Sequence, residues 1–212
     1  MDSVSEGPDW PEMEFLFEFA SNYSYLSVMR IGALARAARV RVRWRPLLLG
    51  PIFRDMGWNN SPFVLQEQKG RYVWKDWARQ ADKHGLAHQR PTQFPRASML
   101  PMRVATLAQD QPWMEAFCQA VMRQNFVEDV DINDPKNVLR ALRGLVDDPA
   151  VLLVRAAEEP NKSRLREQTA QAQQRGVFGA PTFFVGEEMF WGDDRLEDAL
   201  AWAVKGSKST RR

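Results

Sequence analysis

Cysteine is almost absent from this 212-residue sequence, which contains Cys118 alone. A single cysteine excludes an intrachain disulfide framework, a Cys-x-x-Cys redox pair and a cysteine-rich zinc or iron–sulfur site. Because Cys118 lies among apolar residues, we predict that it is buried in the core. This cysteine usage is typical of the cytoplasm, which is the compartment we expect.

Long apolar runs are missing as well. No run reaches the roughly 18 residues that a membrane span needs, because the densest candidates contain Arg or Glu. The first dozen residues are acidic, and they lack the basic start, apolar stretch and small-residue cleavage site of a secretory signal. We therefore expect no association with a membrane.

The sequence also lacks a continuous basic tract and a metal-binding motif. Its net charge is only +2, although acids gather before residue 20 and arginines between Ser21 and Arg54. Such a block favours an anionic ligand, but its discontinuity argues against nucleic-acid binding. His84 and His88 have the helical metal-ligand spacing, yet Gly85 interrupts the helix. We expect no nucleic-acid partner and no metal site.

Hydrophobic periodicity predicts a strand, a helix and a second strand at the start of the chain. Phenylalanines alternate with glutamates over residues 13–19, which is the period of a strand. An apolar stripe at helical spacing follows over residues 23–38, and alternation returns over residues 40–44. This order is typical of a βαβ unit.

Helical signals dominate the middle of the chain. Three Ser-Pro or Asp-Pro pairs place a capping residue before proline at the first helical position. They are Ser61-Pro62, Asp134-Pro135 and Asp148-Pro149. A long polar helix over residues 162–175 is expected to end at Gly176.

The end of the chain returns to strands. Residues 181–185 and 188–191 are predicted to form a hairpin through Gly186-Glu187. A capping-box-like start at Asp194 then predicts a last helix that ends near Lys205.

The element order predicts an α/β protein with a thioredoxin-like fold (βαβ…ββα) and a large all-helical insertion, as in DsbA. Residues 13–50 and 177–205 would form the thioredoxin-like domain, and residues 51–176 would form the inserted helical domain. Residues 1–12 are interpreted as a mobile leader, and residues 206–212 as a polar tail.

The turn after the first strand is where a thioredoxin plan carries its reactive sulfur, because a helix N-terminus lowers the pKa of a thiol. Here Ser21 and Ser24 occupy the Cys-x-x-Cys spacing without sulfur, which excludes disulfide exchange as the native activity. A hydroxyl at this place can donate a hydrogen bond to an external thiolate. Ser21 can also be a simple N-cap residue, and its position alone favours this second interpretation.

A second candidate motif precedes the third strand. In thioredoxin-like glutathione binders, the proline before this strand is cis, and the residue before it pairs with a peptide ligand. Pro181 and Ala180 hold these positions. Asp193 and Asp194, at the start of the last helix, either face a ligand ammonium group or cap the helix.

Several motifs resemble the 2-hydroxychromene-2-carboxylate isomerase family, which is similar to kappa-class glutathione transferases and has a DsbA-like fold. They are Phe-x-Phe-x-Ser-x-Tyr-Ser-Tyr-Leu near the start, Phe-Gly-Ala-Pro-Thr-Phe-Phe, and Phe-Trp-Gly-Asp-Asp-Arg-Leu near the end. The middle agrees through Pro46-Leu-Leu-Leu-Gly50, Asn59 with Pro62, Lys69 with Tyr72 and Asp76, and Phe94-Pro95 with Met102-Arg103. The resemblance covers about residues 13–204.

The resemblance implies glutathione as the cofactor and assigns residues to it. Ser21 matches the active-site serine, which hydrogen-bonds the glutathione sulfur and favours its thiolate. Ala180, before the cis Pro181, matches the residue that pairs with the tripeptide backbone. The stretch that grips the γ-glutamyl end corresponds to Trp191, Gly192, Asp193 and Asp194.

Two positions depart from the pattern of this family. Asn22 stands where the family commonly has proline, which alters the turn after Ser21. Ala97 stands where the family commonly has asparagine, which removes a polar contact and puts the identity of the aromatic substrate in question.

Three functions follow as hypotheses. The first is a glutathione-dependent cis–trans isomerase of aromatic degradation, in which a small aromatic carboxylate meets Asn59 or Lys69. The second is a kappa-type glutathione transferase or peroxidase, and the third is a non-catalytic thioredoxin-like binding protein. The resemblance also implies a homodimer. The aromatic residues of the insertion are expected mainly in the core, with a few lining the substrate site. They are Trp58, Tyr72, Trp74, Trp77, Phe94 and Trp113.

Overall fold

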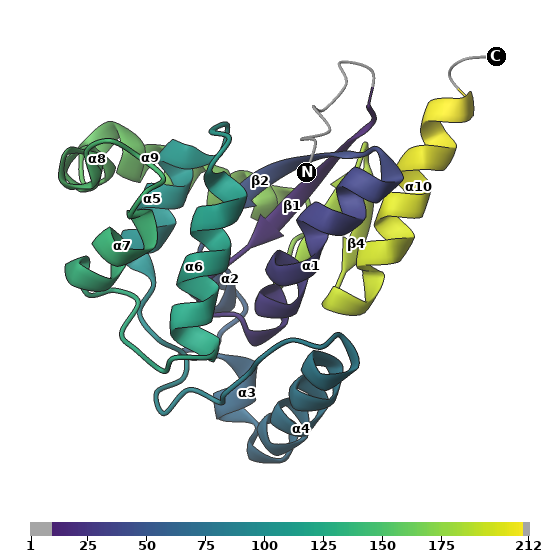
Figure 1. Ribbon diagram of the computed structural model, residues 1–212. Coiled ribbons are helices and arrows are strands. Elements are labelled where there is room, and N and C mark those ends of the chain that lie inside the picture. The colour runs from purple at the N-terminus through teal and green to yellow at the C-terminus, as the bar shows by residue number, and fades with distance from the viewer. Residues whose placement is uncertain (1–9, 210–212) are drawn as a thin grey trace.

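The computed structural model of the protein describes residues 10–209 and is built around a four-stranded mixed sheet (Figure 1). Its strands are β1 (Glu12–Phe17), β2 (Arg41–Pro46), β3 (Thr182–Val185) and β4 (Glu188–Trp191). The strand order is β2-β1-β3-β4, with β1 parallel to β2 and antiparallel to β3. The predicted strands are confirmed. Most of the predicted leader and the end of the predicted tail lie outside the described residues.

Alternation along β1 divides the core between the two faces of the sheet. Met13, Phe15 and Phe17 are fully buried on the face that α1 (Asn22–Ala38) and α10 (Leu196–Ser209) cover. The opposite face packs Leu16 in a smaller cluster with apolar residues of α2 (Leu49–Asp55) and α9 (Glu159–Gln174). Across the strands, the rings of Phe15 and Phe183 stack with their centroids 5.3 Å apart. The central strands β1 and β3 are therefore buried on both faces, as the thioredoxin-like prediction requires, whereas the edge strand β4 is mostly exposed.

The insertion is helical, as predicted. It contains α3 (Pro62–Leu65), α4 (Glu67–Lys83), α5 (Met99–Ala108), α6 (Met114–Phe126), α7 (Pro135–Leu142) and α8 (Pro149–Ala156), followed by α9. The side chains of Ser61, Asp134 and Asp148 each accept a hydrogen bond from a backbone N–H of the first turn. These three caps confirm the predicted helix starts.

The start of the last helix differs from the predicted capping box. A 3₁₀ turn, η1 (Asp193–Arg195), precedes α10, and Gly192 before it provides no side-chain cap. Gly192 has φ 111°, a conformation that glycine adopts without strain. Helix α10 also continues to Ser209, beyond the predicted end near Lys205. The Asp-Arg-Leu-Glu pattern thus marks a turn that re-aims the chain rather than a helix cap.

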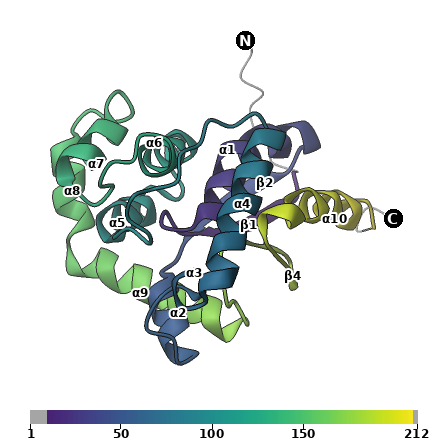
Figure 2. The same cartoon turned by 90° about the horizontal axis from the view of Figure 1, so that it is seen from below.

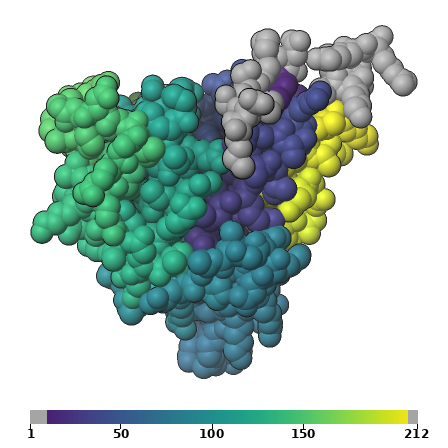
Figure 3. All heavy atoms as spheres, in the orientation of Figure 1, coloured from purple at the N-terminus to yellow at the C-terminus, as the bar shows by residue number. Residues whose placement is uncertain are grey.

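Helices α3 and α4 lie across the end of the sheet at which β1 stops and α1 begins (Figures 1 and 2). In the space-filling view this segment forms a protruding lobe at the lower end of the molecule (Figure 3). Over the described residues, none of the helices combines the length and apolar character needed to cross a membrane. The lobe brings the insertion against the first turn of α1, where the candidate site lies.

Candidate functional site

A cavity of about 1240 Å³ lies between the start of α1, the β3–β4 end of the sheet and the insertion. Its walls come from α2, α3, α4, the start of α5 and α9. All nine residues that the sequence singled out for ligands line this one cavity. They are Ser21, Asn59, Lys69, Ala180, Pro181, Trp191, Gly192, Asp193 and Asp194.

At the floor of the cavity, Ser21 links the turn after β1 to the segment before β3. It is the N-cap of α1, and its Oγ accepts a hydrogen bond from Ser24 N over 3.1 Å. The same hydroxyl donates to Ala180 O over 2.9 Å. The capping interpretation is therefore confirmed, and it leaves the hydroxyl hydrogen directed across the cavity floor. Because a hydroxyl rotates freely, this hydrogen can be redirected to a ligand atom.

The segment before β3 presents backbone to the cavity. The Ala180–Pro181 peptide bond is cis, as expected for this motif. Within residues 10–209, no partner accepts a hydrogen bond from the Ala180 N–H. Gly179 is needed here, because a Cβ would stand 2.6 Å from Nε1 of Trp191, which packs over it. An open N–H beside an aromatic wall is suited to the backbone of a peptide ligand.

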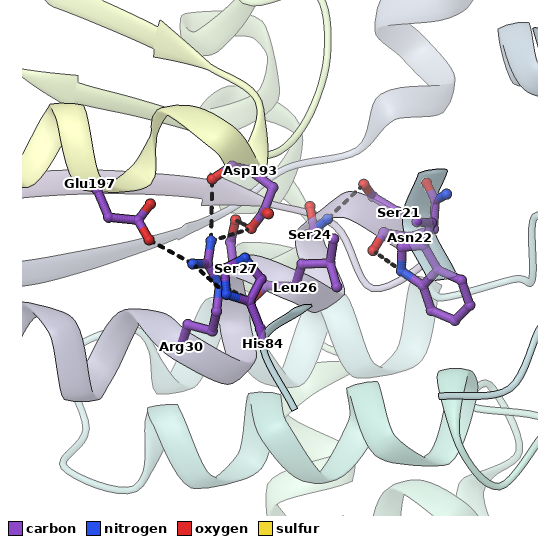
Figure 4. Close-up of polar contacts among 10 residues, drawn as sticks. Ser21, Asn22, Ser24, Leu26, Ser27, Arg30, His84, Asp193 and Glu197 are labelled. Carbon is purple, nitrogen blue, oxygen red and sulfur yellow. Dashed lines mark hydrogen bonds and ion pairs between the residues drawn. The ribbon is translucent and has the colours of Figure 1, made fainter. Parts of the chain in front are cut away.

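The two neighbouring aspartates at the end of β4 have different surroundings. Asp193 is 5% exposed, and its Oδ1 accepts hydrogen bonds from Ser27 Oγ and Arg30 Nη2 over 2.9 and 3.0 Å (Figure 4). Burial raises the pKa of Asp193, and the Arg30 guanidinium opposes this rise. Asp194 is exposed and pairs with Arg195 over 3.0 Å. Asp193 therefore anchors the segment to α1, and Asp194 keeps its carboxylate at the cavity rim.

Arg30 extends this network to a second acid and a histidine. Its Nη1 donates to Glu197 over 2.7 Å and lies 3.5 Å from Nδ1 of His84 (Figure 4). Burial lowers the pKa of His84, and the neighbouring Arg30 charge lowers it further. His88 hydrogen-bonds Asp82 instead. Among the described residues, no group of three or more His, Cys, Asp or Glu side chains is arranged to hold a metal ion.

Glu18 is a cavity residue that the sequence did not reveal. The alternation over residues 13–19 includes Glu18 in the predicted first strand, but β1 ends at Phe17, and Glu18 lines the cavity. Its carboxylate accepts hydrogen bonds from Leu49 N over 3.1 Å and from Ser98 Oγ over 3.2 Å. Burial raises the pKa of Glu18 to about 7, although these two donors oppose the rise. An acid between two phenylalanines was the only local sign of this position.

The expected substrate residues are divided between the cavity and the core. Asn59 and Lys69 are exposed at the cavity wall, beside Trp58, Tyr72 and Phe94. Trp74 and Trp77 are buried, as expected for core residues, and Trp113 packs edge to face against Phe117. Cys118 is also fully buried, as predicted.

Asn22, the residue that departs from the family pattern, leaves its side chain unsatisfied. It is 1% exposed, and neither amide atom has a hydrogen-bond partner in the described part of the chain. The backbone carbonyl of Asn22, in contrast, accepts a hydrogen bond from Nε1 of Trp77 over 2.8 Å. A buried polar group without a partner costs free energy of folding.

Replacing Asn22 with proline is therefore expected to raise the free energy of unfolding by about 1–3 kcal/mol. Ser21 has φ −84° and ψ 119°, the extended conformation that a residue before proline prefers. Proline is also favoured at the first helical position. Urea unfolding of the variant and of Asn22→Ala separates the two contributions, because alanine removes the amide without fixing φ. A proline variant less stable than the wild type would contradict this expectation.

Comparison with known proteins places the fold among described relatives. Residues 12–202 match the family described as a DSBA-like thioredoxin domain. The 2-hydroxychromene-2-carboxylate isomerase of Sphingobium xenophagum is 30% identical over 187 residues, which cover 87% of this chain and 94% of that protein. Glutathione S-transferase kappa 1 of Rattus norvegicus is 28% identical, with 90% of each chain covered.

A solved structure agrees with these sequence relatives. The structure of a 2-hydroxychromene-2-carboxylate isomerase superposes with a TM-score of 0.79 at 25% identity. The superposition covers 94% of this chain and 98% of that one. The resemblance carried by the sequence motifs is thereby confirmed across the sheet and the insertion.

Proposed function

Because the chain belongs to the family of DSBA-like thioredoxin domains that includes 2-hydroxychromene-2-carboxylate isomerases and kappa-class glutathione transferases, we propose that it is a glutathione-dependent cis–trans isomerase. Its substrate would be a small aromatic carboxylate similar to 2-hydroxychromene-2-carboxylate. One observation carries the proposal. The Ser21 hydroxyl caps α1 and contacts Ala180 O across the cavity floor.

The residues present fit glutathione at two points. The open N–H of Ala180 is suited to the peptide backbone of the cofactor, and the exposed carboxylate of Asp194 to its ammonium group. Trp191 and Gly192 form the rim between them, and Asp193 holds that rim against α1. The cavity of about 1240 Å³ exceeds the usual range of small-molecule sites, so a second ligand fits beside the tripeptide.

When bound, glutathione supplies a thiolate that adds reversibly to a conjugated carbon and turns a double bond into a single bond that can rotate. Ser21 contributes by donating a hydrogen bond to the sulfur, assisted by the positive end of α1. A neutral hydroxyl suffices because the attacking atom belongs to the cofactor. Asn59 and Lys69 would meet the substrate carboxylate, with Tyr72 and Phe94 against its ring.

Replacing Ser21 with alanine is expected to raise the thiol pKa of bound glutathione by about one to two units, since a hydrogen bond to a charged group contributes about 1.5–3 kcal/mol. Isomerase kcat/KM near neutral pH should then fall about 10- to 100-fold. Thiolate absorbance near 240 nm, followed against pH, measures the shift.

Ser24→Ala is the matched control for this experiment. It removes a hydroxyl from the same turn, but Ser24 Oγ is buried and has no partner among the described residues. The thiol pKa of glutathione bound to Ser24→Ala should equal that of glutathione bound to the wild type. Equal pKa values for Ser21→Ala and Ser24→Ala would refute the assigned role of Ser21 while leaving glutathione binding intact.

A kappa-type glutathione transferase or peroxidase is the second candidate, favoured by the 28% identity with the rat enzyme over 90% of both chains. The two activities differ in stoichiometry, because isomerisation regenerates glutathione and transfer to a halogenated aromatic acceptor consumes it. The proposal further includes a homodimer in the cytoplasm, which sedimentation and localisation of the protein would test. If neither glutathione nor S-methyl glutathione binds, both enzyme assignments fail and a non-catalytic thioredoxin-like protein remains.

A further inference from the structure

The carboxylate of Glu18 is buried in the cavity wall without a compensating cation. One oxygen accepts from the Leu49 N–H and the other from the Ser98 hydroxyl. Over residues 10–209, no Lys, Arg or His side chain forms an ion pair with Glu18. Two neutral donors do not replace the hydration of an ionised carboxylate, so this group readily takes up a proton near neutral pH.

Glu18 and Ser21 belong to the same turn. Ser21 N donates to Glu18 O over 3.1 Å, and both residues line the cavity. A thiolate held by Ser21 would therefore lie in the same cavity as the Glu18 carboxylate. Two negative charges in such a region disfavour each other, and the two groups titrate as a coupled pair.

The other acids of the cavity each have a charged or hydroxyl partner. Asp193 is held by Arg30 and Ser27, as described above. Asp76 accepts a hydrogen bond of 2.6 Å from the Tyr23 hydroxyl, whose pKa is raised by burial and by this carboxylate. Asp194 is exposed to solvent and paired with Arg195. Glu18 alone among these acids is both buried and free of a charged partner.

We propose that Glu18 is the proton acceptor for the glutathione thiol, a role that rests on the glutathione dependence proposed above. The S–H bond breaks, an O–H bond forms on the Glu18 carboxylate, and the negative charge passes from Glu18 to the sulfur. The number of charges in the cavity is unchanged, so no second buried charge has to be accommodated. The proton returns to the sulfur when glutathione leaves, and no further reactant is required.

Proton counting during binding tests this role. Calorimetric titration with glutathione at about pH 8, in buffers of different ionisation enthalpy, measures the protons released to solvent. The wild type should form the thiolate, seen near 240 nm, with close to zero protons released. Glu18→Gln should release about one proton per thiolate formed, because the amide cannot accept it. S-methyl glutathione, which lacks the thiol, corrects for protons released elsewhere.

The matched control is Glu14→Gln, the same change at an acid of β1 that does not line the cavity and pairs with Arg45 and Arg175. It should behave as the wild type. Wild-type release of about one proton per thiolate overturns the role of Glu18, whatever the stability of the variants. Binding without thiolate formation also overturns it. If neither glutathione nor S-methyl glutathione binds to the wild type, the result is a different one, and it overturns the proposed function itself.

Discussion

Replacing Arg30 with methionine is expected to lower the free energy of unfolding by about 3–5 kcal/mol, the cost of leaving one partner of a buried ion pair alone. Arg30 and Asp193 are 9% and 5% exposed at their side chains, so water cannot replace the lost charge. Their contact fixes the segment after β4 to the middle of α1 (Figure 4). Urea unfolding followed by tryptophan fluorescence would measure the loss.

Two further variants identify the cause of the stability lost in Arg30→Met. Arg30→Met combined with Asp193→Asn removes both charges and should recover most of the stability, since the amide oxygen introduced at this position would still accept from Ser27. Arg71→Met breaks an exposed pair with Glu67 and should change stability by less than about 1 kcal/mol. A loss in Arg30→Met no larger than that in Arg71→Met would contradict the buried-pair interpretation.

Replacing Trp77 with alanine is expected to cost about 3–5 kcal/mol, as for other large aromatic side chains removed from a core. Trp77 is 1% exposed, and its ring packs against Tyr25, Trp74 and Phe126. Its Nε1 also donates to Asn22 O, beside Ser21. Trp77 thus connects α4 to the first turn of α1, as the hydrogen bond from Tyr23 to Asp76 also does.

Trp77→Phe is the comparison for this variant. Phenylalanine keeps most of the apolar contacts and loses the hydrogen bond, so a loss of about 1 kcal/mol is expected. Because α4 carries Lys69, Tyr72 and Asp76, Trp77→Ala should also weaken ligand binding more than Trp77→Phe does. Equal unfolding free energies for the two variants would show that the ring contributes little packing.

Local patterns were sufficient for most of the fold. The alternation of Met13, Phe15 and Phe17 marks β1, because a strand buries every second side chain on one face. The caps at Ser61, Asp134 and Asp148 are equally local, since each side chain bonds a backbone N–H two or three residues on. Element boundaries were less accurate, and the 3₁₀ turn before α10, whose Asp193 contacts Ser27 and Arg30 of α1, was missed.

The site was predicted where a motif carries its own geometry, as at Ser21 and Ala180-Pro181. It was missed where the chemistry depends on partners far along the chain. Glu18 has the alternation of a strand, and only the Leu49 N–H and the Ser98 hydroxyl make it a buried acid. Likewise, the residues near Asp193 in the sequence do not predict its ion pair with Arg30, which lies 163 residues earlier. Electrostatic contacts between residues so far apart produce no periodic pattern in the sequence.

The hydrogen bond between Ser21 and Ala180 spans 159 residues of sequence, and this separation sets an order on assembly during synthesis. β1 lies between β2 and β3, so one of its edges stays unpaired until residues 182–185 have left the ribosome. The inserted helices precede β3 in the chain and can form earlier. An unpaired edge is a template for pairing with other chains. The cavity floor is therefore completed only after β3 has been synthesised, at the same stage as the open edge of β1 becomes paired.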